Sequence, residues 1–438
     1  MKIERVDTAV IQGNYDWTLV RVYTDHAYGT GECFCSPGLT AVVRDMAPLL
    51  LGEDARDVDR LWYKMRWAVS HAGSTGGTVW HAISGIEAAL WDLVGKLLNV
   101  PVYQLLGGKY REDIRIYMDC HAGEGLEALS NILLPVSPAW GTRNHSQSSE
   151  VNHPAHGRAY GKPDLDEVFT PQMYAKRARE AVDKGFTAIK FDLDVPNPYT
   201  YDTYNGALNA AEVKFMASLA EAVRTEVGDH VDIGFDCHWR YNVSDAIRLA
   251  HALEPIDAAF LEDPVPPENI EAQRLMSQAT KTAISSGENR YLRHGFREIF
   301  ESGALGLVAP DFQKVGGLLE AKRIADMADT YYVNVVPHNI SSLIGTFASC
   351  HVAAATPNFW ALEFHAADVP FWNDLVDTGS SGPIIQNGAI HLNERPGIGV
   401  ELNETVAKRY AKPGELWFGE ALTTSENAPL GSQPGGGR

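Results

Sequence analysis

Ionisable residues end successive apolar, strand-like segments in the middle of the chain. These residues are Lys190, Asp236, Glu262, Glu288, Asp311, His338 and Glu363. From Asp236 onward they recur every 23 to 27 residues, close to the length of one strand, one helix and their connections. In a barrel of parallel strands such groups gather on one rim, where barrel active sites are built. The spacing therefore predicts a single active site assembled from most of the strands.

Three of these carboxylates, Asp236, Glu262 and Glu288, are expected on adjacent strands, where they would repel one another unless a cation lies among them. Ligands that are all oxygen favour a hard ion, and Mg²⁺ keeps positions open for water and substrate, whereas zinc usually brings His or Cys. We therefore predict a Mg²⁺ site on these residues. Taken singly, each has a structural alternative: a helix cap, an ion pair with arginine, or a bond to the backbone.

Two histidines are candidates for moving protons. Asp311 and His338 end neighbouring strands, so the carboxylate can orient the imidazole and raise its basicity, which predicts a general base. His238 lies two residues beyond Asp236, and the alternation of side chains along a strand places both on the same face. A proton donor beside the metal is useful when a group must leave. The alternative for His238 is a hydrogen bond to a loop carbonyl.

Lys190 and Asp192 also share one face at the end of their strand, across the barrel mouth from His338. The ammonium of Lys190 could contact a substrate carboxylate or act as a base. If Asp192 neutralises Lys190, the pair is structural instead.

An alternation of strands and helices must position these residues. Residues 1–35 alternate as strands and residues 40–107 have apolar positions at helical spacing, which indicates an α+β unit. From residue 114 strand and helix patterns alternate. The predicted strands lie at 114–120, 186–192, 231–238, 258–264, 283–289, 306–312, 334–338 and 359–365. Eight strands and seven helices over about 250 residues favour a closed β/α barrel over an open doubly wound sheet.

This pattern of strands and helices predicts the boundaries of the domains. We predict an N-terminal α+β unit at 1–113, a barrel at 114–385, a return of the chain to the first unit at 386–425 and a disordered tail at 426–438. Long polar loops at 141–164 and 196–206 follow the first two barrel strands. Loops after the strands lie on the catalytic face of a barrel, so these are expected to form walls or lids of the site. The alternative is that they only decorate the surface.

Composition narrows the class of partner. The 438 residues carry a formal net charge of −19, and no cluster of Lys and Arg suits nucleic acid. The first residues resemble neither a signal peptide nor a membrane span, so we expect a cytoplasmic protein. The odd number of cysteines, without zinc-type spacing, favours free buried thiols. We expect a homo-oligomer that acts on a small molecule and binds neither nucleic acid nor membrane.

Several motifs give the chain a resemblance to the mandelate racemase subgroup of the enolase superfamily, up to about residue 418. They are IEAALWDLVGKLLNVPVYQLLGG at 86–108, FDCHWR at 235–240, FLEDPVPPEN at 260–269, SGEN at 286–289 and PGIGVEL at 396–402. The resemblance implies an α+β capping domain, formed by both ends of the chain, on a (β/α)₇β barrel. It also implies Mg²⁺ on the three carboxylates and abstraction of the proton beside a substrate carboxylate, a chemistry known for such sites.

The same resemblance bears on individual residues. Racemases and several acid-sugar dehydratases of the subgroup carry Lys-x-Lys, with the second lysine as base, where this chain has Lys190-Phe191-Asp192. A base on this strand is therefore not expected, and racemisation, which needs bases on both faces, is disfavoured. FDCHWR is similar to the Asp-x-His arrangement of galactonate and mannonate dehydratases, in which the histidine helps to expel the 3-hydroxyl. The residues expected to bind substrate are Glu363, Asp192, Arg240 and, in the region of the family's specificity loop, Trp17 with its neighbour Asp16.

We therefore expect a Mg²⁺-dependent dehydratase of a sugar acid, an aldonate such as gluconate, galactonate, mannonate or a pentonate, that forms a 2-keto-3-deoxy acid. His338 would act as base with Asp311 as its partner, His238 as acid, and Lys190 as an electrostatic aid. One rival is a racemase, epimerase or cycloisomerase on the same scaffold. Another is a sugar-acid-binding protein with vestigial catalysis.

Overall fold

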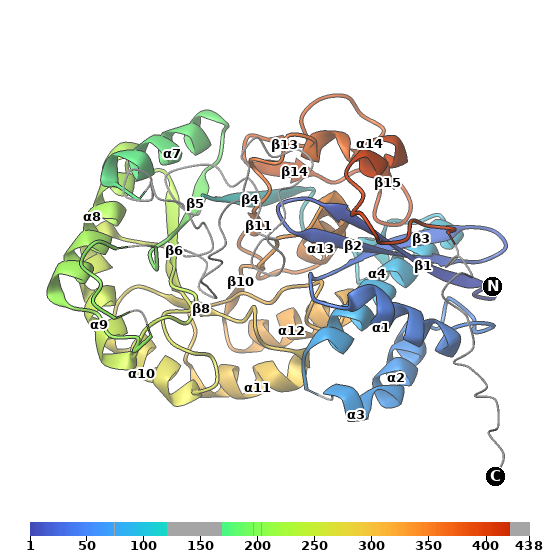
Figure 1. Cartoon of the computed structure of the whole chain (residues 1–438), viewed down its shortest axis with the longest axis horizontal. Helices are drawn as coiled ribbons and strands as arrows, with labels where there is room; N and C mark the ends of the chain where they lie inside the picture. Colours follow the sequence, from blue (N-terminus) through green and yellow to red (C-terminus); the bar gives the residue numbers. More distant parts are fainter. Residues whose placement is uncertain (74, 121–168, 196, 203, 421–438) are drawn as a thin grey trace, which may run out of the picture.

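The computed structural model describes residues 1–73, 75–120, 169–195, 197–202 and 204–420. Figure 1 shows a barrel formed by the middle of the chain beside a smaller α+β unit to which both ends of the chain contribute. The predicted loop at 141–164 and the predicted tail at 426–438 lie outside the described residues. In the described part of the chain, every helix is too short or too polar to cross a lipid bilayer.

The barrel contains the eight parallel strands that the sequence predicts. They are β4 (Asp113–Asp119), β5 (Ala188–Asp192), β6 (Asp232–Asp236), β7 (Phe260–Glu262), β8 (Ile284–Ser286), β9 (Leu307–Val308), β10 (Asn334–Val335) and β11 (Leu362–Phe364). The helices described between them are α7 (Pro171–Asp183), α8 (Ala210–Val227), α9 (Val243–Leu253), α10 (Ile270–Ala279), α11 (Leu292–Ser302), α12 (Leu318–Thr330) and α13 (Leu343–Ala354). A short 3₁₀ turn, η5 (Glu254–Ile256), follows α9.

The ring of strands closes on itself. Neighbouring strands pair in parallel from β4 to β10, and β11 pairs with β4. Between β10 and the start of β11, Trp360 N donates to Val335 O at 2.8 Å, and Glu363 N donates to Pro337 O at 3.2 Å. The predicted (β/α)₇β architecture is confirmed.

Local sequence explains where the barrel helices begin. α8, α9 and α10 each start after an asparagine, Asn209, Asn242 or Asn269, whose side chain accepts a hydrogen bond from a backbone N–H of the first turn. These caps satisfy donors that the helix itself cannot. Helix α13 differs because all of its residues are buried. It contacts the barrel strands on one side and β3 and α5 of the smaller unit on the other.

The smaller unit is an antiparallel sheet packed on helices. Its strands are β1 (Arg5–Gln12), β2 (Asp16–Tyr23) and β3 (Tyr28–Cys33), and its helices are α1 (Leu39–Met46), η1 (Ala47–Leu49), α2 (Val58–Ala68), α3 (Ser70–Gly73), α4 (Thr78–Leu98) and α5 (Val102–Leu105). The largely buried α4 lies directly on β3. A Cβ at Gly31 would lie 2.2 Å from Gly85 O, so only glycine permits this approach.

The segment after the barrel contacts both parts of the molecule. β13 (Ile385–Gln386) and β14 (Ala389–His391) form a hairpin that pairs with β4 of the barrel, and β15 (Glu401–Leu402) pairs with β12 (Val376–Asp377), which follows η6 (Trp372–Asp374). After α14 (Glu404–Arg409) the chain reaches β1, where Lys412 N donates to Val10 O at 2.9 Å. The strands of this segment thus pair with the barrel and with β12, while Gly397 bridges to Pro101 of the first unit. The domain limits stay predictions.

Two buried glutamates of the smaller unit cap helices of the barrel. Glu32, on β3, accepts hydrogen bonds from Ser342 N and Gly345 N, both at 2.9 Å, at the start of α13. Glu87, on α4, accepts from Leu318 N at 2.7 Å and from the next backbone N–H at 3.1 Å, at the start of α12. Carboxylates are favoured at helix N-termini, so these contacts fix the cap on the barrel.

All five cysteines are free, as the sequence predicts. Four of them are buried, while Cys35 is only partly buried and lies on the wall of the cavity between the cap and the barrel mouth.

Candidate active site

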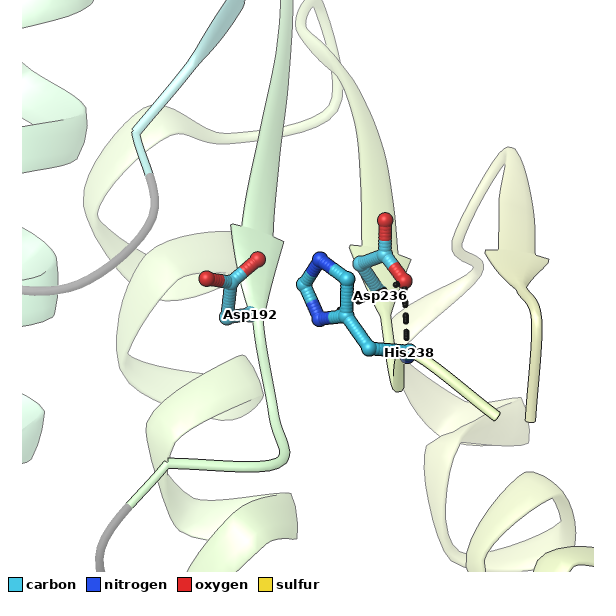
Figure 2. A group of neighbouring side chains, drawn as sticks. All are labelled: Asp192, Asp236 and His238. Carbon is cyan, nitrogen blue, oxygen red and sulfur yellow. Dashed lines mark hydrogen bonds and ion pairs between the residues drawn. The ribbon is translucent and has the colours of Figure 1, made fainter. Parts of the chain in front are cut away.

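The register of the barrel sheet sets three carboxylates in a row. Asp192 on β5 pairs with Asp236 on β6, and Asp236 pairs with Glu262 on β7. Each stands at the carboxyl end of its strand, and Lys190 lies two residues before Asp192, so its side chain shares their face. Figure 2 shows Asp192 and Asp236 at the ends of neighbouring strands, with the ring of His238 between them.

The ammonium of Lys190 lies among buried carboxylates. Its Nζ is 2.9 Å from Asp236 Oδ2, 3.0 Å from Glu262 Oε2, 2.8 Å from Glu363 Oε1 and 3.7 Å from Asp119 Oδ2. Burial lowers the pKa of Lys190, but the surrounding carboxylates raise it further, to well above its ordinary value. The ammonium therefore stays charged. Among the described residues its ion pairs are with these four carboxylates, so the alternative of a pair with Asp192 is not what neutralises it.

The three predicted metal ligands fall into two neighbouring groups. Carboxylate oxygens of Glu262, Asp263 and Glu288 lie within 4.8 Å of one another, and so do ligand atoms of Asp192, Asp236 and His238. Lys190 connects the groups through its hydrogen bonds to Asp236 and Glu262. The first group offers oxygen only, which suits Mg²⁺, whereas the second includes an imidazole nitrogen.

The charge balance at the mouth of the barrel fits a divalent cation. The buried carboxylates there, Asp236, Glu262, Glu288 and Glu363, form what we call the carboxylate rim. A single ammonium faces four carboxylates, and Glu262 Oε1 is buried without a hydrogen-bond partner in the described part of the chain. Burial raises the pKa of Glu262 well above its ordinary value; Lys190 lowers this pKa, while Asp236 and Glu363 raise it further. Carboxylates in this position repel one another unless more positive charge is supplied.

The predicted dyad comes together at the ends of β9 and β10. His338 Nδ1 lies 2.7 Å from Asp311 Oδ2, and His338 Nε2 lies 3.3 Å from Glu288 Oε2. Burial lowers the pKa of His338, but Glu288, Glu363 and Asp311 outweigh it and raise the pKa to about 9. Asp311 thus orients one ring nitrogen and leaves the other directed at the carboxylate rim.

His238 is placed by a turn and not by strand alternation. β6 ends at Asp236, and His238 has a φ of 40°, in the left-handed region. Its Nδ1 lies 3.0 Å from Asp194 Oδ1 and 3.8 Å from Asp236 Oδ1. Burial lowers the pKa of His238, while Asp236, Asp194 and Asp192 raise it well above its ordinary value. The imidazole is therefore held protonated beside the rim.

Glu363 is the middle residue of β11 and lies within the same cluster. Its Oε2 accepts a hydrogen bond from Asn339 N at 3.0 Å, and its Oε1 faces Lys190. Burial raises the pKa of Glu363, but Lys190 and His338 lower it to about 2. This residue is thus a charged carboxylate at the mouth of the barrel.

A cavity of about 610 Å³ lies between the cap and the barrel mouth. Its barrel wall includes Lys190, His238, Glu288, His338 and Glu363, so five of the predicted residues face one space. Its cap wall runs from Phe34 to Thr40 and is completed by residues of β2 and the C-terminal segment.

Three predicted substrate-binding residues, Asp192, Trp17 and Arg240, do not line this cavity. Trp17 is buried, its Nε1 donates to Ile340 O at 3.2 Å, and its neighbours Asp16 and Thr18 face the cavity in its place. Alternation of side chains along β2 explains why Asp16 and Thr18 line the cavity and Trp17 does not, because residues 16 and 18 point to the opposite face from residue 17. Arg240 borders two other hollows beside Gly206, one of which shares His238 with this cavity.

Sequence reasoning missed other residues of the site. Asp194, which orients His238, continues the alternation Lys190, Asp192, Asp194 and could have been found by extending it. Asn289 and Lys314 line the cavity close to Glu288 and Asp311 in the sequence. Nothing in the local pattern marks the cap residue Phe34, which reaches the site only through the docking of the two units.

Family models match both parts of the chain. Residues 8–107 match the mandelate racemase / muconate lactonizing enzyme N-terminal domain. Residues 173–406 match the enolase C-terminal domain-like family.

Individual proteins are similar over nearly the whole length. A D-xylonate dehydratase of Haloferax volcanii is 42% identical over 421 residues, which cover 96% of this chain and 91% of that protein. A D-galactonate dehydratase family member of Musicola paradisiaca is 29% identical, with 95% of each chain covered. The crystal structure of a mandelate racemase/muconate lactonizing enzyme-like protein from Rubrobacter xylanophilus, 41% identical, superposes with a TM-score of 0.83 over 95% of this chain and 99% of that one.

Proposed function

The chain belongs to the mandelate racemase / muconate lactonizing enzyme family of the enolase superfamily, and we propose that it is a Mg²⁺-dependent hydro-lyase that dehydrates an aldonate. The observation that carries the proposal is that two histidines, each oriented by its own aspartate, line one cavity with the carboxylate rim. The identity with a D-xylonate dehydratase makes a five-carbon aldonate the first substrate to test.

The rim would hold the metal. Asp236, Glu262 and Glu288 are the proposed ligands, and their excess negative charge supports this assignment. When bound, Mg²⁺ supplies positive charge that stabilises the negative charge developing on the substrate carboxylate. Lys190 adds a fixed charge beside the same oxygens, and its raised pKa makes it an electrostatic aid and a poor base.

His338 is the proposed base. Its Nδ1 is occupied by Asp311, so its Nε2 takes the proton from C2 of the substrate. The pKa of about 9 reflects the negative charges of Glu288 and Glu363, and a cation held by Glu288 would offset them and leave Nε2 without a proton before the reaction. Asp311 keeps the ring in one orientation and stabilises the imidazolium that forms. The electron pair of the broken C2–H bond moves toward the carboxylate and gives an enediolate.

His238 is the proposed acid. Its ring, held by Asp194, gives a proton to the 3-hydroxyl while the C3–O bond breaks, so that oxygen leaves as water. The electron pair of the enediolate forms the C2–C3 double bond, and the resulting enol becomes the 2-keto-3-deoxy acid. A raised pKa suits this role, because the donor must carry its proton before the reaction.

A panel of aldonates and aldarates with Mg²⁺ tests the proposal. We expect a keto acid, detected with semicarbazide, from D-xylonate or a related aldonate. In deuterated water His338→Asn should lose both this product and exchange of the C2 proton. Exchange that persists undiminished in His338→Asn would transfer the role of base to Lys190. An epimer without keto acid would contradict dehydration.

A further inference from the structure

Three lysines line the cavity, and they differ in whether a nearby carboxylate balances the charge of the ammonium. Lys190 is surrounded by four carboxylates, and Lys412 Nζ lies 2.6 Å from Asp16 Oδ2. Lys314 makes no ion pair with a carboxylate among the described residues, although it is only 4% exposed. It is therefore the cavity lysine whose charge the described protein leaves unbalanced.

Lys314 is held in place by neutral groups. Its Nζ donates to Asn289 Oδ1 at 2.5 Å and lies 4.4 Å from the centre of the Phe34 ring. A second ring, that of Tyr291, is centred 6.0 Å away. An ammonium has three N–H donors, and the Asn289 amide takes one of them. Two donors remain for acceptors in the cavity.

The position of Lys314 relates it to the reacting end of a substrate. The Phe34 ring packs against the ammonium and also lies 6.0 Å, centre to centre, from the ring of His338. Lys314 is thus about one aromatic ring away from the proposed base, on the wall formed with the cap. A chain whose C2 lies at His338 would extend its remaining carbons along this wall.

We propose that Lys314, oriented by Asn289, binds the hydroxyl oxygens of the sugar chain beyond C3 and thereby selects polyhydroxy acids. This inference rests on the proposed function for the placement of C2. A buried cation without a counter-charge is costly, and an oxygen acceptor from the ligand relieves that cost. A site built to hydrogen-bond a hydroxyl rejects analogues that lack it.

The test compares two acids that differ only in their distal oxygens. One is the pentonate that the enzyme dehydrates best, and the other is the 2,3-dihydroxypentanoate of the same C2 and C3 configuration, without the 4- and 5-hydroxyls. For Lys314→Met we expect the KM for the pentonate to rise about 10- to 100-fold with kcat within a few-fold. The KM for the dideoxy acid should change less than about twofold.

Two further measurements separate binding from folding. Methionine keeps the packing against Phe34 and removes the unbalanced charge, so the Tm of Lys314→Met should be equal to or above that of the wild type. Lys412→Met, at the lysine that Asp16 already neutralises, is the matched control and should shift the KM of the pentonate several-fold less.

Equal losses for both acids, or no loss for either, would overturn the assignment of Lys314. Calorimetric dissociation constants for the same two acids, measured with Mg²⁺, keep this test independent of turnover. If the wild type binds the pentonate but forms no keto acid, the proposed function fails while Lys314 is still judged by binding. If the wild type binds no aldonate, both proposals fail.

Discussion

Buried carboxylates occur in two regions of this molecule, and their surroundings differ. At the barrel rim, Glu262 shares one ammonium with its neighbours and has an oxygen without a hydrogen-bond partner in the described structure. At the docking surface of the cap, both oxygens of Glu87 accept hydrogen bonds, from two backbone N–H groups of α12 and from Trp91 Nε1. Burial raises the pKa of each.

The difference in hydrogen bonding distinguishes a metal-binding site at the barrel rim from a structural contact between the cap and the barrel. A buried carboxylate whose oxygens are all met by fixed backbone donors stabilises the fold. A group of carboxylates with more negative charge than the protein balances is prepared for a cation. Substitutions in the two regions should therefore affect different properties.

The largest effect is expected from Glu262→Gln. Removing one anionic ligand should lower Mg²⁺ affinity and keto-acid formation by several orders of magnitude, beyond the roughly 10–100-fold typical of residues behind a ligand. The Tm without metal should not fall, because the change reduces repulsion at the rim. Calorimetry with Mg²⁺ and thermal unfolding measure these outcomes. Full turnover, or a clearly lower Tm without metal, would contradict the conclusion that Glu262 serves metal binding and not stability.

His238→Asn tests the same rim without removing a proposed ligand. General acid catalysis contributes about 10²–10⁴-fold, so keto acid should form more slowly by that factor. The C2 proton should then exchange with deuterated water faster than product forms, because the enediolate returns instead of losing water. This partition is informative only where exchange is seen. Dehydration at the wild-type rate would place the acid elsewhere.

Glu87→Ala should show the opposite pattern. Two backbone N–H groups and an indole N–H would lose their acceptor, which should lower the free energy of unfolding by about 3 kcal/mol. kcat should stay within about twofold, since Glu87 lies outside the cavity. Denaturant unfolding gives the first quantity. Glu271→Ala, at an exposed glutamate, is the control, with a change within about 0.5 kcal/mol.

The smallest effect concerns Glu32 and pH. Burial raises the pKa of Glu32 from 4.5 to about 7, although Ser342 and Gly345 donors lower it. Between these values the folded protein keeps a proton that the unfolded chain has lost, so stability from this residue decreases as pH rises. Glu32→Gln does not titrate. The stability of the wild type relative to this variant should therefore fall by about 2 kcal/mol from pH 5 to 7. A constant difference would show that Glu32 is charged throughout.

The sequence determined the barrel and the composition of its rim. Strand and helix patterns alternate with a constant length, and parallel strands of a barrel deliver their carboxyl ends to one side, so Asp311 and His338 could be placed together from spacing alone. The sequence also predicted His238 beside Asp236, where it lies, but for a different reason: β6 ends before His238 and a left-handed turn sets its ring.

Only the tertiary structure decided which groups balance which charges. Lys190 meets Glu262 and Glu363 across the barrel, and Phe34 approaches Lys314 and His338 because the cap docks on the barrel mouth. Spacing along a chain fixes which face and which end of a strand a residue occupies. It does not fix distances between residues on distant strands or on another domain, and Coulomb energies and hydrogen bonds depend on those distances.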